Sequence, residues 1–207
     1  MNKISEKIRE GFKAVCRCIV TFVIYTYCRI VYRAKIIGKE NIPKEGSLIF
    51  CGNHRTYLDP PLIVVTSSRK MRFIAKEELK NNLLFSFLIF AYDGIYVKRD
   101  SKDIGALKEA MKTLKSGGCI GIFPEGTRNG IEKNEGKLKN GAAYMSLKTG
   151  AKIIPIGIKG EVKPFHQVTI TYGKPMDFSE LLKEKSAKEL EDYVSEEIKK
   201  EILKLSK

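Results

Sequence analysis

Residues that commonly bind metals or exchange protons near neutral pH are scarce in this sequence. It has only two histidines among 207 residues, His54 and His166, so only two side chains have an ordinary pKa near neutrality. The five cysteines form no Cys-x-x-Cys pair, and the sequence therefore predicts neither a structural zinc site nor any other metal. Because the cysteine count is odd and three of the five lie in one apolar segment, we expect reduced thiols in a cytosolic setting.

Signals for repeats and for nucleic-acid recognition are also missing. The sequence has no internal repeat, low-complexity tract, helix-turn-helix signal or aromatic RNA-binding motif. Its length favours one domain, or one domain with an appendage, and a hydrophobic content of 43% is enough for a packed core. The formal net charge of +14 favours an anionic partner, namely nucleic acid, an anionic membrane surface or a phosphorylated substrate. Because the cations alternate with glutamates, we expect no nucleic-acid partner. A nucleic-acid binder and a catalytically silent membrane-surface protein are the alternatives.

The N-terminal segment lacks a long uncharged run. Residues 14–32 are apolar but interrupted by Arg17 and Arg29, and the part between these arginines is shorter than the ~20 residues that cross a bilayer. Residues 25–29 are also a poor signal-peptide cleavage region. We expect residues 1–33 to form a helix in the membrane interface at the cytoplasmic face, and residues 34–207 to form the main domain. A core-packing helix is the alternative. The expected apolar side of the helix consists of Val20, Phe22, Val23, Ile24, Tyr27, Ile30 and Val31.

After residue 33, short β-branched runs alternate with helical patterns, which is typical of an α/β fold. We predict a mixed, largely parallel central sheet flanked by helices. The predicted strands are residues 34–37, 47–52, 72–75, 95–98, 119–123, 153–158 and 167–172, and the predicted helices are 59–67, 82–91, 104–116, 139–148 and 180–205, the last in one or two pieces.

One histidine has a carboxylate nearby in the sequence. His54 follows the predicted strand 47–52 directly, and Asp59 comes five positions later at a predicted helix start. Such a pair suits general-base chemistry, because the carboxylate fixes the imidazole tautomer and the free nitrogen takes a proton. The alternative is that Asp59 only caps the helix. Cys51 invites a thiol-nucleophile interpretation, but on a strand it is more typical of a small apolar filler. His166 has no nearby motif and is interpreted as structural.

Basic residues follow other predicted strands. The loop of residues 123–128 contains Gly126, which permits exposed amide groups, and Arg128, whose planar fork suits phosphate. Glu125 can hold Arg128 or a substrate hydroxyl. Arg99 and Lys76 end two further strands and are candidates for an anion, with a solvated surface as the alternative. In open α/β sheets ligands bind beyond the strand ends, so these groups converge if their strands are neighbours.

Four stretches together resemble the ordered blocks of the glycerolipid acyltransferases, most closely the bacterial 1-acyl-sn-glycerol-3-phosphate type. They are Asn53-His54-x4-Asp59-Pro60 and residues 94–100, 122–128 and 154–158. The resemblance covers roughly residues 34–175, and its fourth block is the least distinctive. Asn129 stands where a serine is common in the family.

The resemblance implies acyl transfer from a thioester, on coenzyme A or acyl carrier protein, to the sn-2 hydroxyl of lysophosphatidic acid, without another cofactor. It implies that His54 is the general base, that Asp59 orients it, and that the block from Glu125 through Gly126 and Thr127 to Arg128 binds the acceptor phosphate. Arg99 is similar to a second acceptor-binding residue, and Lys76 falls where relatives place a supporting phosphate ligand. Glycerol 3-phosphate or another lysophospholipid is the alternative acceptor.

Overall fold

The computed structural model describes residues 3–98, 103–126, 138–161, 163–183 and 186–207. The described helices and strands, in chain order, are α1 (Lys3–Val31), β1 (Lys35–Ile37), η1 (Lys39–Asn41), β2 (Leu48–Gly52), α2 (Asp59–Thr66), β3 (Met71–Lys76), η2 (Glu77–Asn81), α3 (Leu83–Ala91), β4 (Ile95–Val97), α4 (Ile104–Lys115), β5 (Cys119–Ile122), α5 (Gly141–Thr149), β6 (Lys152–Lys159), β7 (Thr169–Tyr172), η3 (Glu180–Lys183) and α6 (Ala187–Ser206). Each predicted strand and helix is present within a few residues of its expected ends. The last predicted helix is divided into η3 and α6.

The strands form a seven-stranded sheet in the order β1-β7-β6-β2-β5-β3-β4. Every pairing is parallel except β6 with β7, so the prediction of a mixed, largely parallel sheet is confirmed. All five residues of the central strand β2 are buried, as expected for a parallel strand covered on both faces. The carboxyl ends of β2, β5, β3 and β4 therefore meet at one edge of the sheet.

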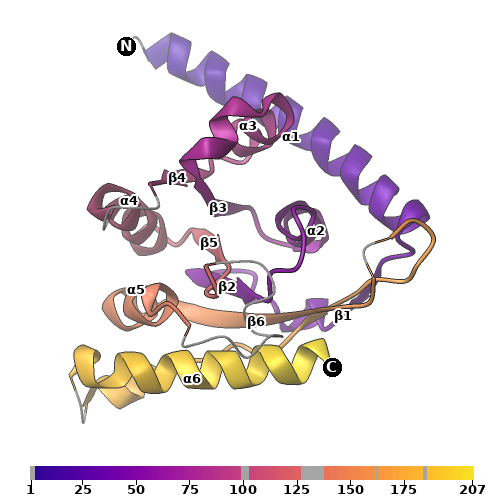
Figure 1. Ribbon diagram of the computed structural model, residues 1–207. Coiled ribbons are helices and arrows are strands. Elements are labelled where there is room, and N and C mark those ends of the chain that lie inside the picture. Colours follow the sequence, from indigo (N-terminus) through magenta and orange to yellow (C-terminus); the bar gives the residue numbers. More distant parts are fainter. Residues whose placement is uncertain (1–2, 99–102, 127–137, 162, 184–185) are drawn as a thin grey trace.

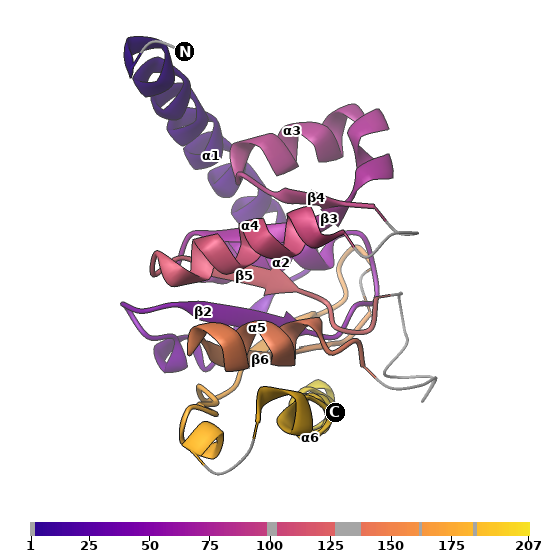
Figure 2. The same ribbon diagram turned by 90° about the vertical axis from the view of Figure 1, so that its left-hand side faces the viewer.

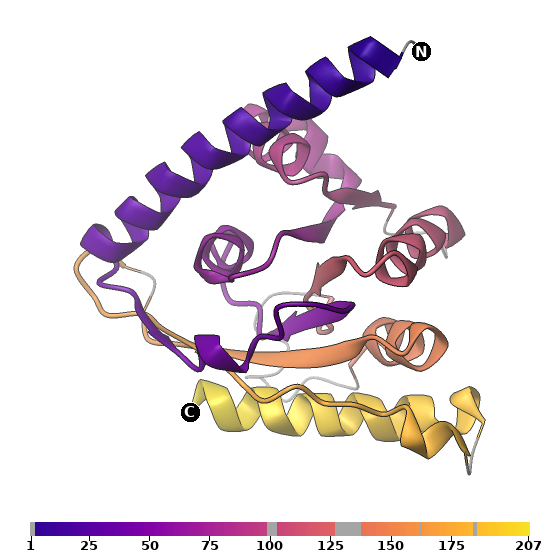
Figure 3. The same ribbon diagram turned by 180° about the vertical axis from the view of Figure 1, so that it is seen from behind.

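Helices cover both faces of this sheet (Figure 1). On one face, α4, α5 and α6 pack against a cluster that includes Ile49, Cys51 and Ile120. On the other face, α2 and the C-terminal part of α1 pack against a cluster that includes Phe50 and Ile156. The view from the side and the view from behind show the same layers, with α6 beneath β6 and α1 on the opposite side of the molecule (Figures 2 and 3).

Helix α1 combines a buried C-terminal end with a largely exposed remainder. Cys28 and Tyr32 are buried in the same core as the sheet, so this end is part of the folded domain. Toward the N-terminus, the helix lies against α3, behind it in the view of Figure 1, and has an exposed apolar side. This side begins earlier than the sequence predicted and includes Ile8, Phe12, Val15, Ile19, Phe22, Val23, Tyr27 and Ile30.

Candidate active site

The residue that follows β2, Asn53, anchors the start of the candidate site through a buried side-chain contact. Asn53 directly follows β2 and is only 1% exposed. Its side-chain nitrogen donates to the carbonyl of Ile158 at 2.9 Å, and its side-chain oxygen accepts the N–H of the same residue at 2.7 Å. This paired contact to β6 fixes the backbone immediately before His54. Sequence reasoning quoted Asn53 as part of a motif but gave it no role.

The loop after β2 folds around the carboxylate of Asp59, which is completely buried. Its Oδ2 atom lies 3.0 Å from Nδ1 of His54 and accepts the backbone N–H groups of Arg55 at 2.5 Å and Thr56 at 2.7 Å. Its Oδ1 atom accepts the Thr56 hydroxyl at 3.1 Å, and that hydroxyl accepts the N–H of Leu58. These contacts replace water around the buried charge and hold the carboxylate in one orientation.

This arrangement excludes the alternative that Asp59 only caps α2. Leu58 occupies the cap position without a side-chain bond, and Asp59 is the first residue of the helix, followed by a proline in the first turn. Its carboxylate points back to the loop because two amide donors and the imidazole lie there. A buried carboxylate offers only acceptors, so Nδ1 of His54 carries the proton toward it and Nε2 is the free basic nitrogen. The histidine side chain is 20% exposed, so part of it reaches the protein surface.

The loop after β5 contacts His54 directly. Glu125 Oε1 accepts the backbone N–H of His54 at 2.9 Å. This contact follows from the strand register, because β2 and β5 are parallel neighbours with Cys51 opposite Ile122, and the same register continued puts His54 level with Glu125. The sequence prediction gave Glu125 a partner in Arg128 or in the substrate, and it missed the link between the two loops.

An aromatic ring packs against one face of the His54 imidazole. The rings of His54 and Phe123 are stacked with centroids 4.3 Å apart, and the rings of Phe123 and Phe73 are 5.6 Å apart. Phe73 lies flat across Gly121, where a Cβ would come within 2.5 Å of the ring. The glycine on β5 therefore makes room for a row of rings that ends at the histidine. Spacing alone did not identify this row, because Phe73 belongs to a different strand.

Gly126 has a left-handed backbone, with φ of +67°, and its N–H donates to the carbonyl of Phe123 at 3.1 Å. The side chain of Lys139 lies over it, so that a Cβ on Gly126 would be 2.6 Å from Lys139 Cε and 3.0 Å from Nζ. The backbone N–H of Lys139 donates to the carbonyl of Pro124 at 2.9 Å. The predicted glycine turn thus carries a cation that the sequence analysis did not select.

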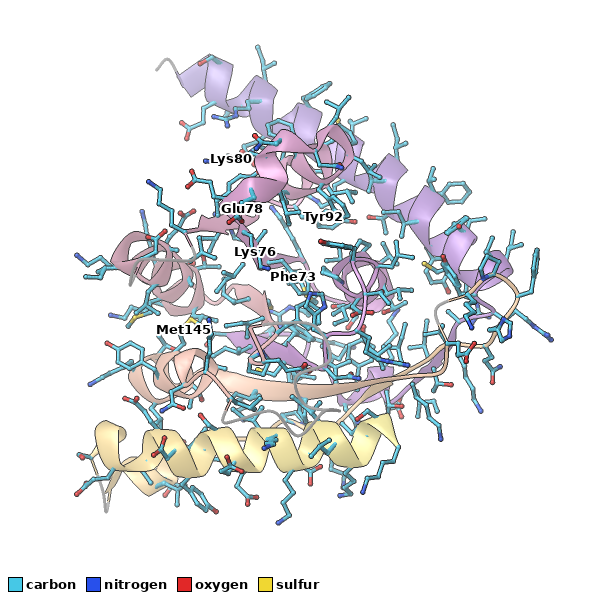
Figure 4. The ribbon with its side chains drawn as sticks, viewed as in Figure 1. Phe73, Lys76, Glu78, Lys80, Tyr92 and Met145 are labelled. Atoms are coloured by element: carbon cyan, nitrogen blue, oxygen red, sulfur yellow. The ribbon has the colours of Figure 1, made fainter. Side chains whose placement is uncertain are left out.

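Of the other predicted acceptor-binding residues, the structure describes Lys76 but not Arg99, Thr127 or Arg128. Lys76 is the last residue of β3 and pairs with Val97 of β4 (labelled with Phe73 of the same strand in Figure 4). Because β3 lies next to β5 with Phe73 opposite Gly121, the continued register puts Lys76 level with Pro124. The predicted residues Arg99, Thr127 and Arg128 lie outside the described residues. The sequence analysis expected the site residues to converge if their strands are neighbours. Strands β2 and β5 are adjacent, β3 is the next strand beyond β5, and β4 lies beyond β3.

The remaining nucleophile and proton-carrier candidates lie apart from this site. Cys51 is completely buried on β2, and burial raises the pKa of its thiol, which disfavours the reactive thiolate. His166 is exposed, and its Nδ1 lies 3.2 Å from the carbonyl of Pro164. Within the described part of the chain, no group of three or more His, Cys, Asp and Glu side chains is arranged to hold a metal ion.

An α/β sheet with a carboxylate-held histidine at its carboxyl edge, beside a glycine turn with a nearby cation, has the parts needed for base-assisted transfer to a substrate hydroxyl. Comparison with known proteins gives the family. The family model described as Acyltransferase matches residues 33–159, which is more than half of the chain. The chain therefore belongs to the acyltransferase family.

Several relatives have more specific names. A "1-acyl-sn-glycerol-3-phosphate acyltransferase" of Borreliella burgdorferi is 36% identical over 123 residues, which cover 58% of this chain and 49% of the relative. A protein of the same name from Bacillus subtilis is 25% identical over 80% of this chain and 86% of its own length. The crystal structure of "1-acyl-sn-glycerophosphate (LPA) acyltransferase, PlsC" from Thermotoga maritima has a TM-score of 0.68 and 28% identity, with 99% of this chain and 84% of that chain covered. The chain spans about half the length of the first curated relatives, with 49% and 57% of two of them covered.

Proposed function

We propose that this protein transfers a fatty acyl group from an acyl thioester to the sn-2 hydroxyl of 1-acyl-sn-glycerol 3-phosphate, giving phosphatidic acid. The observation that carries this proposal is the His54–Asp59 pair, whose free imidazole nitrogen faces away from a buried carboxylate at the edge of the sheet where Glu125 and Gly126 lie. The printed names of the relatives support the same acceptor.

The chemistry needs no nucleophile from the protein, because a thioester is already activated. As the acceptor hydroxyl attacks the thioester carbonyl, Nε2 of His54 takes its proton, and the imidazolium that forms is stabilised by Asp59 at Nδ1. The tetrahedral intermediate then collapses, the carbon–sulfur bond breaks, and the leaving thiolate takes the proton from the imidazolium. Positioning of both substrates supplies much of the remaining rate. Coenzyme A and acyl carrier protein are both thioester donors for this step.

A cation at the carboxyl edge of the sheet suits an acceptor that carries a phosphate. Lys76 lies at the same edge of the sheet; in the sequence, the predicted phosphate-binding residue Arg99 comes two positions after β4, and Thr127 and Arg128 come five and six positions after β5. An arginine binds phosphate through a planar pair of donors, so Arg128 is assigned the main contact and Arg99 a supporting one. A phosphate monoester acceptor fits this set better than a neutral lipid.

We propose a location on the cytoplasmic face of a membrane, and helix α1 supports the association with a membrane. Among the described residues it is the one helix long and apolar enough to cross a membrane by length and composition, over Ser5–Val31, with only 17% of its most apolar window buried. Three polar side chains in the middle of the helix turn toward the domain: buried Lys13 pairs with Asp93, Arg17 donates to the carbonyl of Ala91, and Thr21 meets the hydroxyl of Tyr92, which Figure 4 labels beside α3. A helix docked to its own domain by its polar side presents its apolar side outward.

This orientation favours a helix lying in the membrane interface over one that crosses the bilayer. Helix α3, which α1 contacts, also exposes apolar side chains, namely Leu83, Leu84 and Phe87. At the C-terminal end of α1, an open hollow of about 350 Å³ is lined by Arg29, Arg33, Ala34, Lys35 and Gln167. Cations beside an apolar surface suit anionic lipid headgroups, where each gains about 1 kcal/mol.

The test uses purified protein, a labelled acyl chain and a panel of acceptors. Acyl-coenzyme A and acyl-carrier protein are each offered with lysophosphatidic acid, glycerol 3-phosphate or lysophosphatidylcholine. We expect labelled phosphatidic acid, and we expect His54→Ala to lower kcat by about 10²–10⁴-fold while the circular dichroism spectrum stays unchanged. Preference for another acceptor would overturn the assignment of lysophosphatidic acid, and full turnover by folded His54→Ala would overturn the mechanism.

A further inference from the structure

Lys139 is fixed to the turn next to His54 by both its backbone and its side chain. Its N–H donates to the carbonyl of Pro124, and its Cε and Nζ atoms lie over Gly126, in the place that any other side chain at position 126 would occupy. The neighbouring residue of that turn, Glu125, accepts the N–H of His54. Chain segments distant in the sequence therefore bring a primary amine to the turn that also contacts the proposed base.

The position of Lys139 Nζ favours a role in binding an anion over a role in covering apolar surface. A lysine that only covers apolar surface packs its carbon stem and extends its charged end into water. Here the nitrogen lies over the turn together with the end of the stem, with Cε, Nζ and Cδ at 2.6, 3.0 and 3.1 Å from the position that a Cβ of Gly126 would take, so the charge stands next to the turn. Lys139 is exposed, and among the described residues no carboxylate pairs with it. Within the described part of the chain, its ammonium group is therefore not neutralised by an acid and can donate to an anion.

We propose that Lys139 is an anion-binding residue of this site that contacts the phosphate monoester of the acceptor while the acceptor hydroxyl is at His54. This inference rests on the proposed function and adds to the predicted set a binding residue from the segment before α5. It also explains the glycine at position 126. The left-handed φ of +67° favours glycine, and a Cβ there would push the ammonium group away from the turn.

The experiment compares Lys139→Met with Lys139→Arg and with a matched control, Lys148→Met. Methionine keeps the length of the stem without charge, and Lys148 is an exposed lysine in the last turn of α5. Each variant is assayed with lysophosphatidic acid and with a monoacylglycerol, which presents a similar hydroxyl but no phosphate. Loss of a charge-assisted hydrogen bond predicts an increase of about tenfold in the KM for lysophosphatidic acid in Lys139→Met. We expect little change in kcat, in the KM for the thioester or in the rate with monoacylglycerol. Lys139→Arg recovers part of the loss, and Lys148→Met behaves like the unchanged protein.

A second measurement uses the unchanged protein. Acetylation of lysines by an amine reagent is followed residue by residue with mass spectrometry, and lysophosphatidic acid is expected to protect Lys139 but not Lys148. An unaltered KM in Lys139→Met, an equal loss with both acceptors, or unprotected Lys139 would overturn this inference. An unchanged protein that transfers no acyl group to lysophosphatidic acid would overturn the proposed function instead, so the two failures are distinguishable.

Discussion

Replacing Asp59 by asparagine and by alanine should separate the catalytic role of its charge from the structural role of its oxygen atoms. Oδ2 accepts hydrogen bonds from His54, Arg55 and Thr56, so in Asp59→Asn the amide oxygen of the new side chain is expected to take that position. The amide nitrogen then faces the Thr56 hydroxyl, which rotates to accept. The fold and the orientation of the imidazole are retained in this variant, and only the negative charge is lost.

The expected fall in kcat follows from the lost attraction between the His54 imidazolium and the Asp59 carboxylate. Two unit charges about 4 Å apart interact by about 4 kcal/mol at an effective dielectric constant of about 20. Part of this interaction is screened because the histidine is 20% exposed. Since each 1.4 kcal/mol is a factor of ten in rate, we expect kcat to fall by roughly 10²–10³-fold in Asp59→Asn.

Asp59→Ala has a different expected result, because it leaves the N–H groups of Arg55 and Thr56 without their acceptor. At about 1–3 kcal/mol for each unsatisfied donor, the free energy of unfolding should fall by roughly 2–6 kcal/mol. Urea denaturation followed by circular dichroism measures this loss, and the acyl-transfer assay measures kcat on the same samples. Full kcat in Asp59→Asn, or an Asp59→Ala variant as stable as the unchanged protein, would refute the reasoning.

Three further predictions concern the buried thiol, the exposed side of α1 and the ion pair beneath it. Cys51→Ala should remain active, with a loss of roughly 1 kcal/mol in stability, comparable to one buried methylene group, and a folded but inactive variant would point to a covalent route. Phe22 is 72% exposed, so Phe22→Glu should weaken co-sedimentation with anionic vesicles without changing the urea midpoint, whereas Tyr193→Glu on α6 should bind vesicles normally. Burial alone would raise the pKa of Asp93, but hydrogen bonds from Lys13 and Lys70 hold it below its usual range. A carboxyl group with a lowered pKa stabilises the fold above its unfolded pKa of about 3.9 and loses that contribution as the pH falls further. Urea midpoints should therefore show a stability difference between the unchanged protein and Asp93→Asn at pH 6 that shrinks below about pH 4; a difference that is constant with pH would contradict this sign.

Local features of the fold could be predicted because they depend on nearby residues. The β-branched runs, the proline after Asp59 and the apolar spacing of residues 104–114 each identify a strand or helix within a few residues of its ends. The contact of His54 with Asp59 is of the same kind, since both residues lie in one short loop between β2 and α2. The direction of the Asp59 carboxylate was not predictable from helix-capping preference, because the competing donors are amide groups of the loop itself.

Contacts between distant segments could not be predicted from residue patterns or secondary-structure propensities. The Asn53 contact with Ile158 and the row of rings through Phe73 depend on which strands are neighbours and in which register. The position of Lys139 over Gly126 depends on the course of the connection between β5 and α5. A single sequence contains no direct signal for strand order. Helix α1 shows the same limit, because the sequence showed Arg17 only as an interruption of the apolar stretch, whereas its guanidinium group contacts the carbonyl of Ala91.

The strand order also explains why the loops after β2 and β5 are enough to position His54 as a general base. Because β2 and β5 are adjacent and parallel, their loops leave the same edge of the sheet, and the register brings the His54 backbone within hydrogen-bonding distance of the Glu125 side chain. The imidazole is then held from two directions, by Asp59 at Nδ1 and by Phe123 against its face. Both constraints leave Nε2 as the nitrogen free to react. A site assembled in this way tolerates changes in the rest of the chain as long as the β2–β5 register is kept, since a shift of one residue would separate His54 from Glu125 while leaving the His54–Asp59 loop intact.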